Sequence, residues 1–168
     1  TTDTLDKMGR VTKSAPFEHV TREALEAAAR TFVGRIAQKV PAYSAVRVGG
    51  ERLYEKARRG EEVLAPTREV QIDSVRVLSF SGADVELEVA CGRGTYIRQL
   101  ASDLAEALGT VGHLSALRRL RVGRFSIEGA ATLEMLREWP AESPDESRGA
   151  FHSLREALGD EIAELRLD

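Results

Sequence analysis

The stretch from Val85 to Leu100 constrains the fold of this chain most strongly, because its residue pattern changes twice over a short distance. Residues 84–91 alternate apolar and polar side chains, which is the pattern of a half-buried β-strand. Gly92 and Gly94 follow directly, and glycine allows backbone conformations that other residues avoid. The pattern therefore predicts a strand that ends in a tight glycine turn.

A helix is predicted immediately after this turn, over residues 95–108. Its apolar residues recur at helical spacing, and Gly109 supplies a stop signal. These apolar residues are Ile97, Leu100, Leu104 and Leu108. The first turn of the helix would present Tyr96 and Arg98 from a stiff strand–turn–helix unit, and rigid elements of this kind are where functional sites are most precisely held.

Arg98 would lie at the positive end of the helix dipole, which costs a few tenths of a kcal/mol up to about 1 kcal/mol. A carboxylate partner would offset this cost, and a bidentate pair would also hold the arginine in place. The residues alone favour a structural salt bridge or an exposed side chain for Arg98 over a functional pair. They likewise favour a packing role for Tyr96 over a catalytic one. Cys91 is predicted to be a buried strand residue rather than a nucleophile.

The glycine turn before a helix is also a candidate anion site, because the backbone N–H groups at a helix start can bind phosphate. However, Cys91–Thr95 lacks the G-x-x-x-x-G-K-[ST] pattern of a P-loop and the third glycine of a dinucleotide-binding fingerprint. The sequence therefore does not favour a nucleotide cofactor.

Length and composition are those of one soluble globular domain with a real core: 168 residues, 42% hydrophobic and 30% charged. No apolar run approaches the roughly 20 residues that a membrane span requires, and the first residues, Thr1–Thr4, have no signal-peptide features. A single cysteine excludes an internal disulfide and fits a reducing compartment. His19, His113 and His152 have no metal-ligand spacing, so we predict no metal site.

The net charge of −3 conceals an uneven distribution. Residues 134–168 carry ten acidic and four basic side chains, so the part of the chain before them is net positive by three. That part contains four arginines with no acid among them, namely Arg118, Arg119, Arg121 and Arg124. Contact with RNA phosphates and a solvated surface explain this run equally well.

A second basic segment runs from Arg47 to Arg59 and contains five basic and two acidic side chains. One interpretation is a solvated helix face stabilised by ion pairs. The other is an edge that faces phosphates, with Tyr43 and Tyr54 nearby for stacking or packing. The residues leave both interpretations open.

The remaining patterns predict short strands that alternate with helices and include an antiparallel hairpin. We expect helices at 22–38 (capped by Thr21), 51–59, 113–120 and 132–139 (capped by Thr132), strands at 43–48, 68–80 and 121–127, a turn at Gly49–Gly50, a bulge at Asp73–Ser74, and a linker at 140–149. The predicted fold class is α+β, with a mixed, largely antiparallel sheet flanked by helices.

Several blocks of the sequence, in order, resemble one family closely: the bacterial tRNA pseudouridine-55 synthases of the TruB type. The matching blocks are Thr2-Asp3-Thr4 with Asp6, Gly9 and Val11; Val40-Pro41-Ala42-Tyr43-Ser44-Ala45; Leu53-Tyr54-Glu55-Lys56-Ala57-Arg58-Arg59-Gly60; Cys91-Gly92-Arg93-Gly94-Thr95-Tyr96-Ile97-Arg98; and Gly112-His113-Leu114 through Leu117-Arg118-Arg119 to Gly123-Arg124-Phe125. The resemblance extends over about residues 1–136 and fades in the acidic tail.

The resemblance implies a cofactor-free, cytoplasmic isomerase, monomeric when intact, that converts a uridine in the T-arm stem-loop of tRNA to pseudouridine. In that family a catalytic aspartate attacks the flipped-out nucleotide, and the detached uracil rejoins the sugar through C5. The resemblance implies that Tyr96 packs against the target base, that Arg98 pairs with the catalytic aspartate, and that Leu117 lines the base pocket. Tyr43, Arg47, Arg118 and Arg119 are the further residues expected to bind substrate.

Three departures from the family pattern shape this expectation. The family's catalytic aspartate lies in a G-x-L-D-P motif, and these 168 residues contain no such motif. The family also continues into a small RNA-binding domain of the PUA type, so we expect residues 1–139 to be a partial catalytic domain and residues 140–168 a linker and the start of a connection. Arg47 stands where the family generally has lysine, which keeps the charge but changes the donor geometry.

Three interpretations follow from these departures. The chain is part of a pseudouridine synthase and is inactive alone for want of the nucleophile, it is a non-catalytic RNA-binding remnant, or it is an α/β domain that uses these residues only for packing.

Overall fold

The structure is a computed structural model that describes residues 1–61, 64–138 and 152. The chain divides into two compact units, Thr1–Leu117 and Arg118–Asp168, and each is described here by itself. The predicted boundary between residues 139 and 140, and the linker at 140–149, lie at residues outside the described ones and stay predictions.

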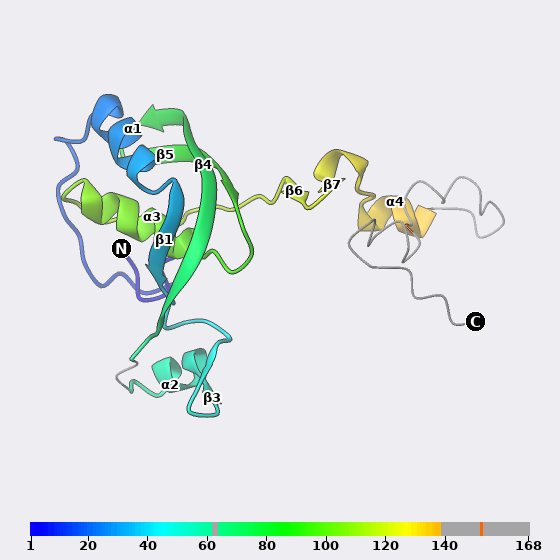
Figure 1. Cartoon of the computed structure of the whole chain (residues 1–168), viewed down its shortest axis with the longest axis horizontal. Coiled ribbons are helices and arrows are strands. Elements are labelled where there is room, and N and C mark those ends of the chain that lie inside the picture. Colours follow the sequence, from blue (N-terminus) through cyan, green and yellow to red (C-terminus); the bar gives the residue numbers. More distant parts are fainter. Residues whose placement is uncertain (62–63, 139–151, 153–168) are drawn as a thin grey trace. The chain divides into compact units, whose positions relative to one another are not determined.

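The first unit is built on a three-stranded sheet with the order β1-β4-β5 (Figure 1). β1 (Gly34–Lys39) pairs antiparallel with β4 (Thr67–Ser81), which pairs antiparallel with β5 (Asp84–Cys91). The hairpin between β4 and β5 turns at Gly82, whose φ of 58° favours glycine. A register shift between Ile72 and Ser74 confirms the predicted bulge, and the largely antiparallel α+β fold is also confirmed.

Helices α1 (Arg22–Thr31) and α3 (Ile97–Ala107) pack against one face of this sheet (Figure 1). Their buried residues Leu25, Ala29 and Leu104 form a core cluster with apolar side chains of β4 and β5. Thr21 caps α1 as predicted, because its hydroxyl accepts a hydrogen bond from the Ala24 N–H at 3.2 Å. The helix predicted at 95–108 is confirmed as α3, with Arg98 in its first turn.

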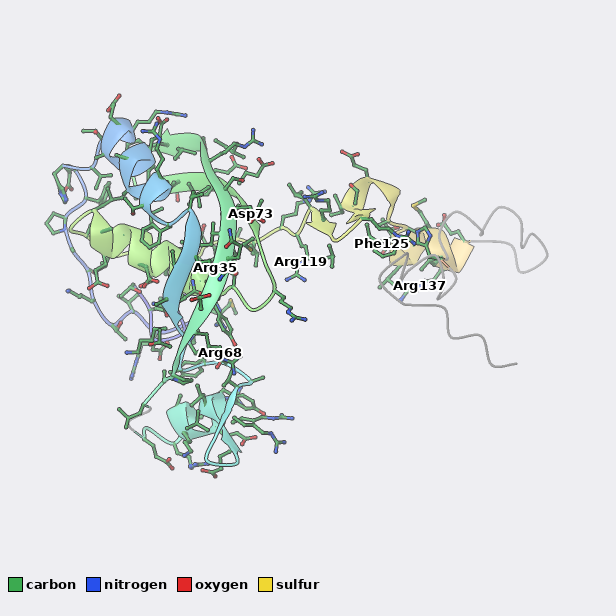
Figure 2. The ribbon with its side chains drawn as sticks, in the orientation of Figure 1. Arg35, Arg68, Asp73, Arg119, Phe125 and Arg137 are labelled. Carbon is green, nitrogen blue, oxygen red and sulfur yellow. The ribbon has the colours of Figure 1, made fainter. Side chains whose placement is uncertain are left out.

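The opposite face of the sheet is polar. Figure 2 shows Arg35 on β1 and Arg68 and Asp73 on β4, and all three side chains are exposed. Arg35 pairs with Glu69 across the two strands at 3.6 Å. Alternation along each strand therefore separates the apolar face that contacts the helices from a charged face.

The segment between β1 and β4 forms a small excursion that contains β2 (Arg47–Val48), β3 (Glu51–Arg52) and α2 (Leu53–Arg58). The predicted turn at Gly49–Gly50 is confirmed, and both glycines have positive φ values, 64° and 87°. The predictions of a strand at 43–48 and a helix at 51–59 were too long. The tight turn commits its flanking residues to a two-stranded ladder, so the helix begins only at Leu53.

The prediction of one helix over 22–38 was wrong. The helix ends at Thr31, and Gly34, with a φ of 111°, begins strand β1. Ile36 fitted the helical stripe by coincidence, because Ile36, Gln38 and Val40 instead share the inner face of a strand at a spacing of two residues.

The predicted helix at 113–120 does not form, and the reason is tertiary. The Leu114 N–H donates to the Leu5 carbonyl at 3.0 Å, and the Lys7 N–H donates to the Leu114 carbonyl at 2.9 Å. This pairing with the N-terminal segment uses the backbone groups that a helix would need. Cys91 was predicted to be buried but is exposed, because it ends the edge strand β5 beside the glycine turn.

The second unit contains β6 (Arg121–Val122), β7 (Phe125–Ser126), the short 3₁₀ helix η1 (Ile127–Gly129) and α4 (Leu133–Glu138). The strand predicted at 121–127 is therefore wrong as a single strand, since Gly123, with a φ of 55°, turns it into a hairpin. The Met135 N–H donates to the Thr132 hydroxyl at 3.2 Å, which confirms the predicted cap. Arg119, Phe125 and Arg137 of this unit appear in Figure 2.

The core of the first unit generates a stability prediction. Leu104 is 4% exposed and joins α3 to α1, so Leu104→Ala is expected to lower the free energy of unfolding by about 2–4 kcal/mol through lost burial and a residual cavity. Leu78→Ala is the matched control, because Leu78 is 50% exposed. Urea denaturation followed by circular dichroism measures both, and equal losses in the two variants would contradict this assignment of the core.

Candidate active site

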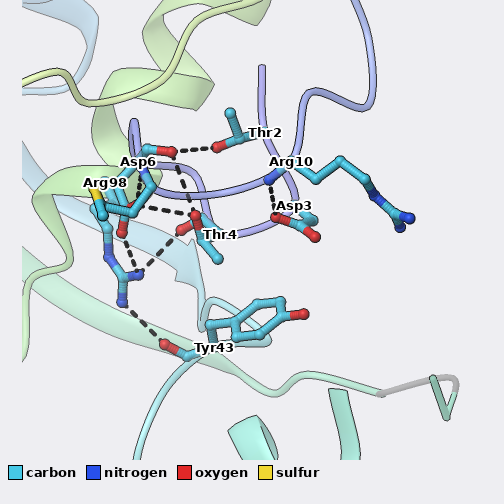
Figure 3. A network of polar contacts seen from close by, with 8 residues as sticks. Thr2, Asp3, Thr4, Asp6, Arg10, Tyr43 and Arg98 are labelled. Atoms are coloured by element: carbon cyan, nitrogen blue, oxygen red, sulfur yellow. Dashed lines mark hydrogen bonds and ion pairs between the residues drawn. The ribbon is translucent and has the colours of Figure 1, made fainter. Parts of the chain in front are cut away.

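The N-terminal segment folds into a compact loop before the first helix. The Asp3 N–H donates to the Arg10 carbonyl at 3.0 Å, and the Arg10 N–H donates to the Asp3 carboxylate at 2.9 Å (Figure 3). Gly9 lies close against this loop, since a Cβ there would lie 2.2 Å from the Thr4 hydroxyl oxygen and the Thr4 side chain would have to move. The loop is held to the rest of the unit by its pairing with Leu114.

Asp6 lies at the turn of this loop, and its carboxylate is held by local hydrogen bonds. Oδ1 accepts from the Thr4 hydroxyl at 3.0 Å and from the Met8 N–H at 3.0 Å. The Asp6 backbone carbonyl accepts from the Thr2 hydroxyl at 2.6 Å, and Thr2 is itself buried. These contacts leave Oδ2 directed at another partner.

That partner is Arg98, from the first turn of α3 (Figure 3). Its Nη1 donates to Asp6 Oδ2 at 3.2 Å and to the Thr4 carbonyl at 3.0 Å, and its Nη2 donates to the Tyr43 carbonyl at 3.0 Å. The two charged side chains are 25% and 29% exposed, so water screens the pair only in part. Arg98 thus joins the helix, the N-terminal loop and the segment that follows β1.

The surroundings of Asp6 shift its acidity in two directions. Partial burial raises the pKa of the carboxyl, but hydrogen bonds from Met8, Thr4 and Arg98, together with the positive charge of Arg98, outweigh this effect. The pKa of Asp6 is therefore lower than its ordinary value, and the group is ionised at neutral pH.

Tyr96 is the N-cap residue of α3, and its backbone is held by Gln38 of β1. The Gln38 Oε1 accepts from the Tyr96 N–H at 2.8 Å, and the Gln38 Nε2 donates to the Tyr96 carbonyl at 3.2 Å. The sheet thereby fixes the start of the helix that carries Arg98. The Tyr96 side chain is half-buried.

The other predicted site residues differ in their exposure to solvent. Tyr43 is half-buried and reaches Arg98 through its carbonyl, whereas Arg47 is exposed on β2 opposite Arg52. Leu117 is 61% exposed at the end of the first unit. Arg118 and Arg119 are exposed and belong to the second unit. The structure therefore brings together Tyr43, Tyr96 and Arg98 among the predicted residues.

The basic segment 47–59 combines features of both interpretations. Glu51 pairs with Lys56 at 3.7 Å and with Arg59 at 3.3 Å, as expected of a solvated face. The guanidinium groups of Arg52 and Arg58 lie 5.9 and 5.4 Å from the centre of the Tyr54 ring. Part of the segment is internally neutralised, and part presents cations around an aromatic ring.

Sequence reasoning missed Asp6 and Gln38. Arg98 does have the carboxylate partner predicted for it, but an acid 92 positions away in the sequence gives no local sign of the pairing. Gln38 had one usable signal in the sequence, namely its place as a polar residue between the apolar Ile36 and Val40. The prediction of a helix over these residues concealed that signal.

Residues 1–97 match a family described as TruB family pseudouridylate synthase (N terminal domain). The chain belongs to the TruB family. Residues 98–160 match the description tRNA pseudouridylate synthase B C-terminal domain, so the two matches meet between Ile97 and Arg98 at the start of α3.

Relatives of this TruB-family chain are named tRNA pseudouridine synthase B. One from Xanthomonas campestris pv. campestris (strain B100) is 48% identical over 136 residues, covering 81% of the chain and 44% of that protein. One from Bordetella parapertussis is 47% identical over 141 residues, covering 83% of the chain and 58% of that protein. The chain therefore spans about half the length of the curated relatives it matches.

A solved structure, "Crystal Structure of a Cbf5-Nop10-Gar1 Complex", contains a chain with a similar fold. The TM-score is 0.55 and the sequence identity is 31%, over 68% of this chain and 30% of that chain. The similarity supports the placement of this TruB-family chain in the pseudouridine synthase fold.

The described residues contain no group of three or more His, Cys, Asp or Glu side chains arranged to hold a metal ion. In the same part of the chain, no helix is long and apolar enough to cross a membrane.

The ion pair predicts a pH-dependent stability difference. Because folding lowers the pKa of Asp6 below its unfolded value of about 3.9, the ionised carboxylate stabilises the fold fully above that pH. This contribution is lost as the pH falls through the folded pKa. Asp6→Asn should therefore cost about 1–2 kcal/mol at pH 7, and the difference from the unaltered chain should shrink below about pH 4.

Urea unfolding across this pH range measures the effect, with Asp84→Asn as the control because Asp84 lies on the exposed β4–β5 hairpin. A pH-independent difference between Asp6→Asn and the unaltered chain would show that the charge of Asp6 is irrelevant to stability.

Proposed function

We propose that these residues form part of a tRNA pseudouridine synthase that isomerises the target uridine in the T-arm of tRNA. The observation that carries the proposal is the paired Arg98 and Asp6 beside the fixed backbone of Tyr96, in a chain of the TruB family. The chain spans about half of its relatives, so the activity is proposed for the protein that contains these residues.

In this proposal Arg98 orients the carboxylate that attacks the flipped nucleotide. Three of its five N–H donors contact Asp6, Thr4 and Tyr43. The Nε–H and one N–H of Nη2 have no acceptor within the described residues, which leaves a pair of donors for a second carboxylate. Asp6 then serves to hold the guanidinium in place and to balance part of its charge.

Tyr96 is proposed to pack against the uracil once the base has left its stack. Extrusion of a base costs a few kcal/mol, which stacking in a pocket and contacts to the RNA backbone must offset. Tyr96 and Arg98 lie two positions apart at the start of α3, so one rigid element would present both the base platform and the carboxylate holder.

The RNA-binding residues in this proposal are Tyr43, Arg47, Leu117, Arg118 and Arg119. The exposure of the three arginines supports phosphate contact, because exposed guanidinium groups are available to the RNA backbone. The exposed Leu117 would gain burial by lining the base pocket. A cytoplasmic, monomeric enzyme is part of the proposal, and the unpaired Cys91 is consistent with a reducing compartment.

Tritium release from tRNA labelled at uridine C5 tests the activity, because the C5 hydrogen is lost when C5 bonds to the sugar. The 168 residues alone should release no tritium, since they contain no G-x-L-D-P motif to supply the nucleophile. The same protein extended upstream in its reading frame to include that motif should release it. Release by neither protein would overturn the proposed function and favour a non-catalytic RNA-binding protein.

Substitution of Arg98 tests its role in the extended protein. Arg98→Lys keeps the charge but loses the fork geometry, so the rate of tritium release should fall about 100-fold. Arg35→Ala is the control, because Arg35 lies on the polar face of the sheet and pairs only with Glu69 among the described residues. An Arg98→Lys protein with the unaltered rate would exclude the proposed role.

The salt dependence of RNA binding tests the arginine contacts. Binding of a T-arm stem-loop to the 168-residue chain should weaken as salt rises, because phosphate contacts release counterions. The double variant Arg118→Ala, Arg119→Ala should reduce the slope of log affinity against log salt by about 1 for each lost contact. Affinity that does not depend on salt would favour an α/β domain that uses these residues only for packing.

A further inference from the structure

We infer that Gln38 is a positioning residue of the active site, whose buried side-chain amide fixes the backbone of Tyr96 and so the direction in which the Tyr96 ring meets the target base. The inference rests on the proposed function. It assigns a role to a residue whose side-chain amide makes hydrogen bonds only with the Tyr96 backbone among the described residues.

Gln38 is buried in an unusual place for an amide. It is 1% exposed on the inner face of β1, in line with Ile36 and Val40, where strand alternation places apolar side chains. A buried amide without hydrogen bonds is strongly destabilising, so such a residue persists only where both ends of the amide find partners. Leucine or methionine at this position would avoid that requirement.

Both partners of the Gln38 amide belong to one residue. Oε1 accepts from the Tyr96 N–H at 2.8 Å, and Nε2 donates to the Tyr96 carbonyl at 3.2 Å. The side-chain amide thus pairs with Tyr96 as a backbone peptide group would. In an antiparallel ladder, two opposite residues likewise exchange both of their N–H···O bonds. The two bonds hold the groups on either side of the Tyr96 Cα and restrict rotation about both of its backbone bonds.

This restraint acts at the start of α3, where the described N-cap residue supplies no side-chain cap. Tyr96 is its N-cap residue, with a φ of −95° and a ψ of 104°, and its side chain makes no capping hydrogen bond. The Tyr96 carbonyl also accepts from the Leu100 N–H at 3.0 Å, which is the first bond of the helix. Gln38 is opposite Arg68 in the β1–β4 ladder, so its two bonds fix the Tyr96 backbone relative to the sheet.

Gln38 would make the same two hydrogen bonds if its role were purely structural. The test must therefore separate an effect on the folding of the chain from an effect on the position of Tyr96. Gln38→Met is the principal variant, because methionine is unbranched, of similar length and suited to burial, but offers no comparable donor or acceptor. Gln38→Asn is the second variant, since it keeps the amide and shortens its reach. Gln71→Met is the matched control on the same sheet, where the exposed Gln71 amide contacts only Asp73 among the described residues.

Amide hydrogen exchange in the 168-residue chain tests the restraint directly. The Tyr96 N–H should be protected in the unaltered chain, although an N-cap N–H has no acceptor within its own helix. In Gln38→Met its exchange should accelerate about five- to tenfold relative to core amides such as that of Leu104. A Tyr96 amide that exchanges as freely as an exposed loop in the unaltered chain would overturn the inference, whatever the variants do.

Base engagement tests the consequence for function. A T-arm stem-loop with 2-aminopurine beside the target uridine should brighten on binding, because extrusion of the uridine unstacks its neighbour. Gln38→Met and Gln38→Asn should bind the stem-loop within about twofold of the unaltered affinity, because phosphate contacts are intact. Each should lose most of the fluorescence change, whereas Gln71→Met should retain it.

The outcomes distinguish this inference from the function on which it rests. If the unaltered chain neither binds nor brightens the stem-loop, the proposed function of this chain fails. If the unaltered chain brightens it and a folded Gln38 variant does so equally, the positioning role is wrong and the proposed function stands. A parallel loss of affinity and fluorescence would mark Gln38 as a merely structural residue.

Discussion

The guanidinium of Arg98 joins three parts of the chain that are far apart in sequence, and the geometry of the site depends on this junction. It contacts the N-terminal loop at Asp6 and Thr4, the segment after β1 at Tyr43, and it extends from the first turn of α3. An arginine at the positive end of a helix is unfavourable by itself. Its neutralisation by Asp6, together with two carbonyl acceptors, turns an unfavourable position into a fixed one.

The site is supported from two directions. Asp6 holds the Arg98 side chain, and Gln38 holds the Tyr96 backbone, so the first residues of α3 are restrained both by the N-terminal loop and by the sheet. Each support depends on a polar group that is at least partly buried and whose oxygen and nitrogen atoms each have a hydrogen-bond partner, since such groups stabilise only when their hydrogen bonds are made. A site with this construction is suited to hold a base and a carboxylate within narrow limits.

The family assignment and the local chemistry address different questions. Membership of the TruB family is the basis for the proposed reaction, whereas the network around Arg98 is the basis for the residues proposed to take part in it. The network also revises one inference. The carboxylate that Arg98 needs for its own stability is Asp6 of this chain, so the pairing expected with the family's nucleophile would be a second interaction of the same guanidinium.

The sequence by itself determined the elements whose patterns are local. The β4–β5 hairpin, the bulge at Asp73–Ser74, helix α3 with Arg98 in its first turn, and the caps at Thr21 and Thr132 follow from alternation, helical spacing and turn residues. Tertiary structure decided the rest. Leu114 pairs with the N-terminal loop and does not form the predicted helix, and pairing with β4 makes residues 34–39 a strand. Asp6 and Gln38 meet α3 from 92 and 58 positions away in the sequence. Local patterns report only which backbone conformation a segment prefers. The partner of a buried charge or amide is set by chain topology, which leaves no periodic trace in the sequence.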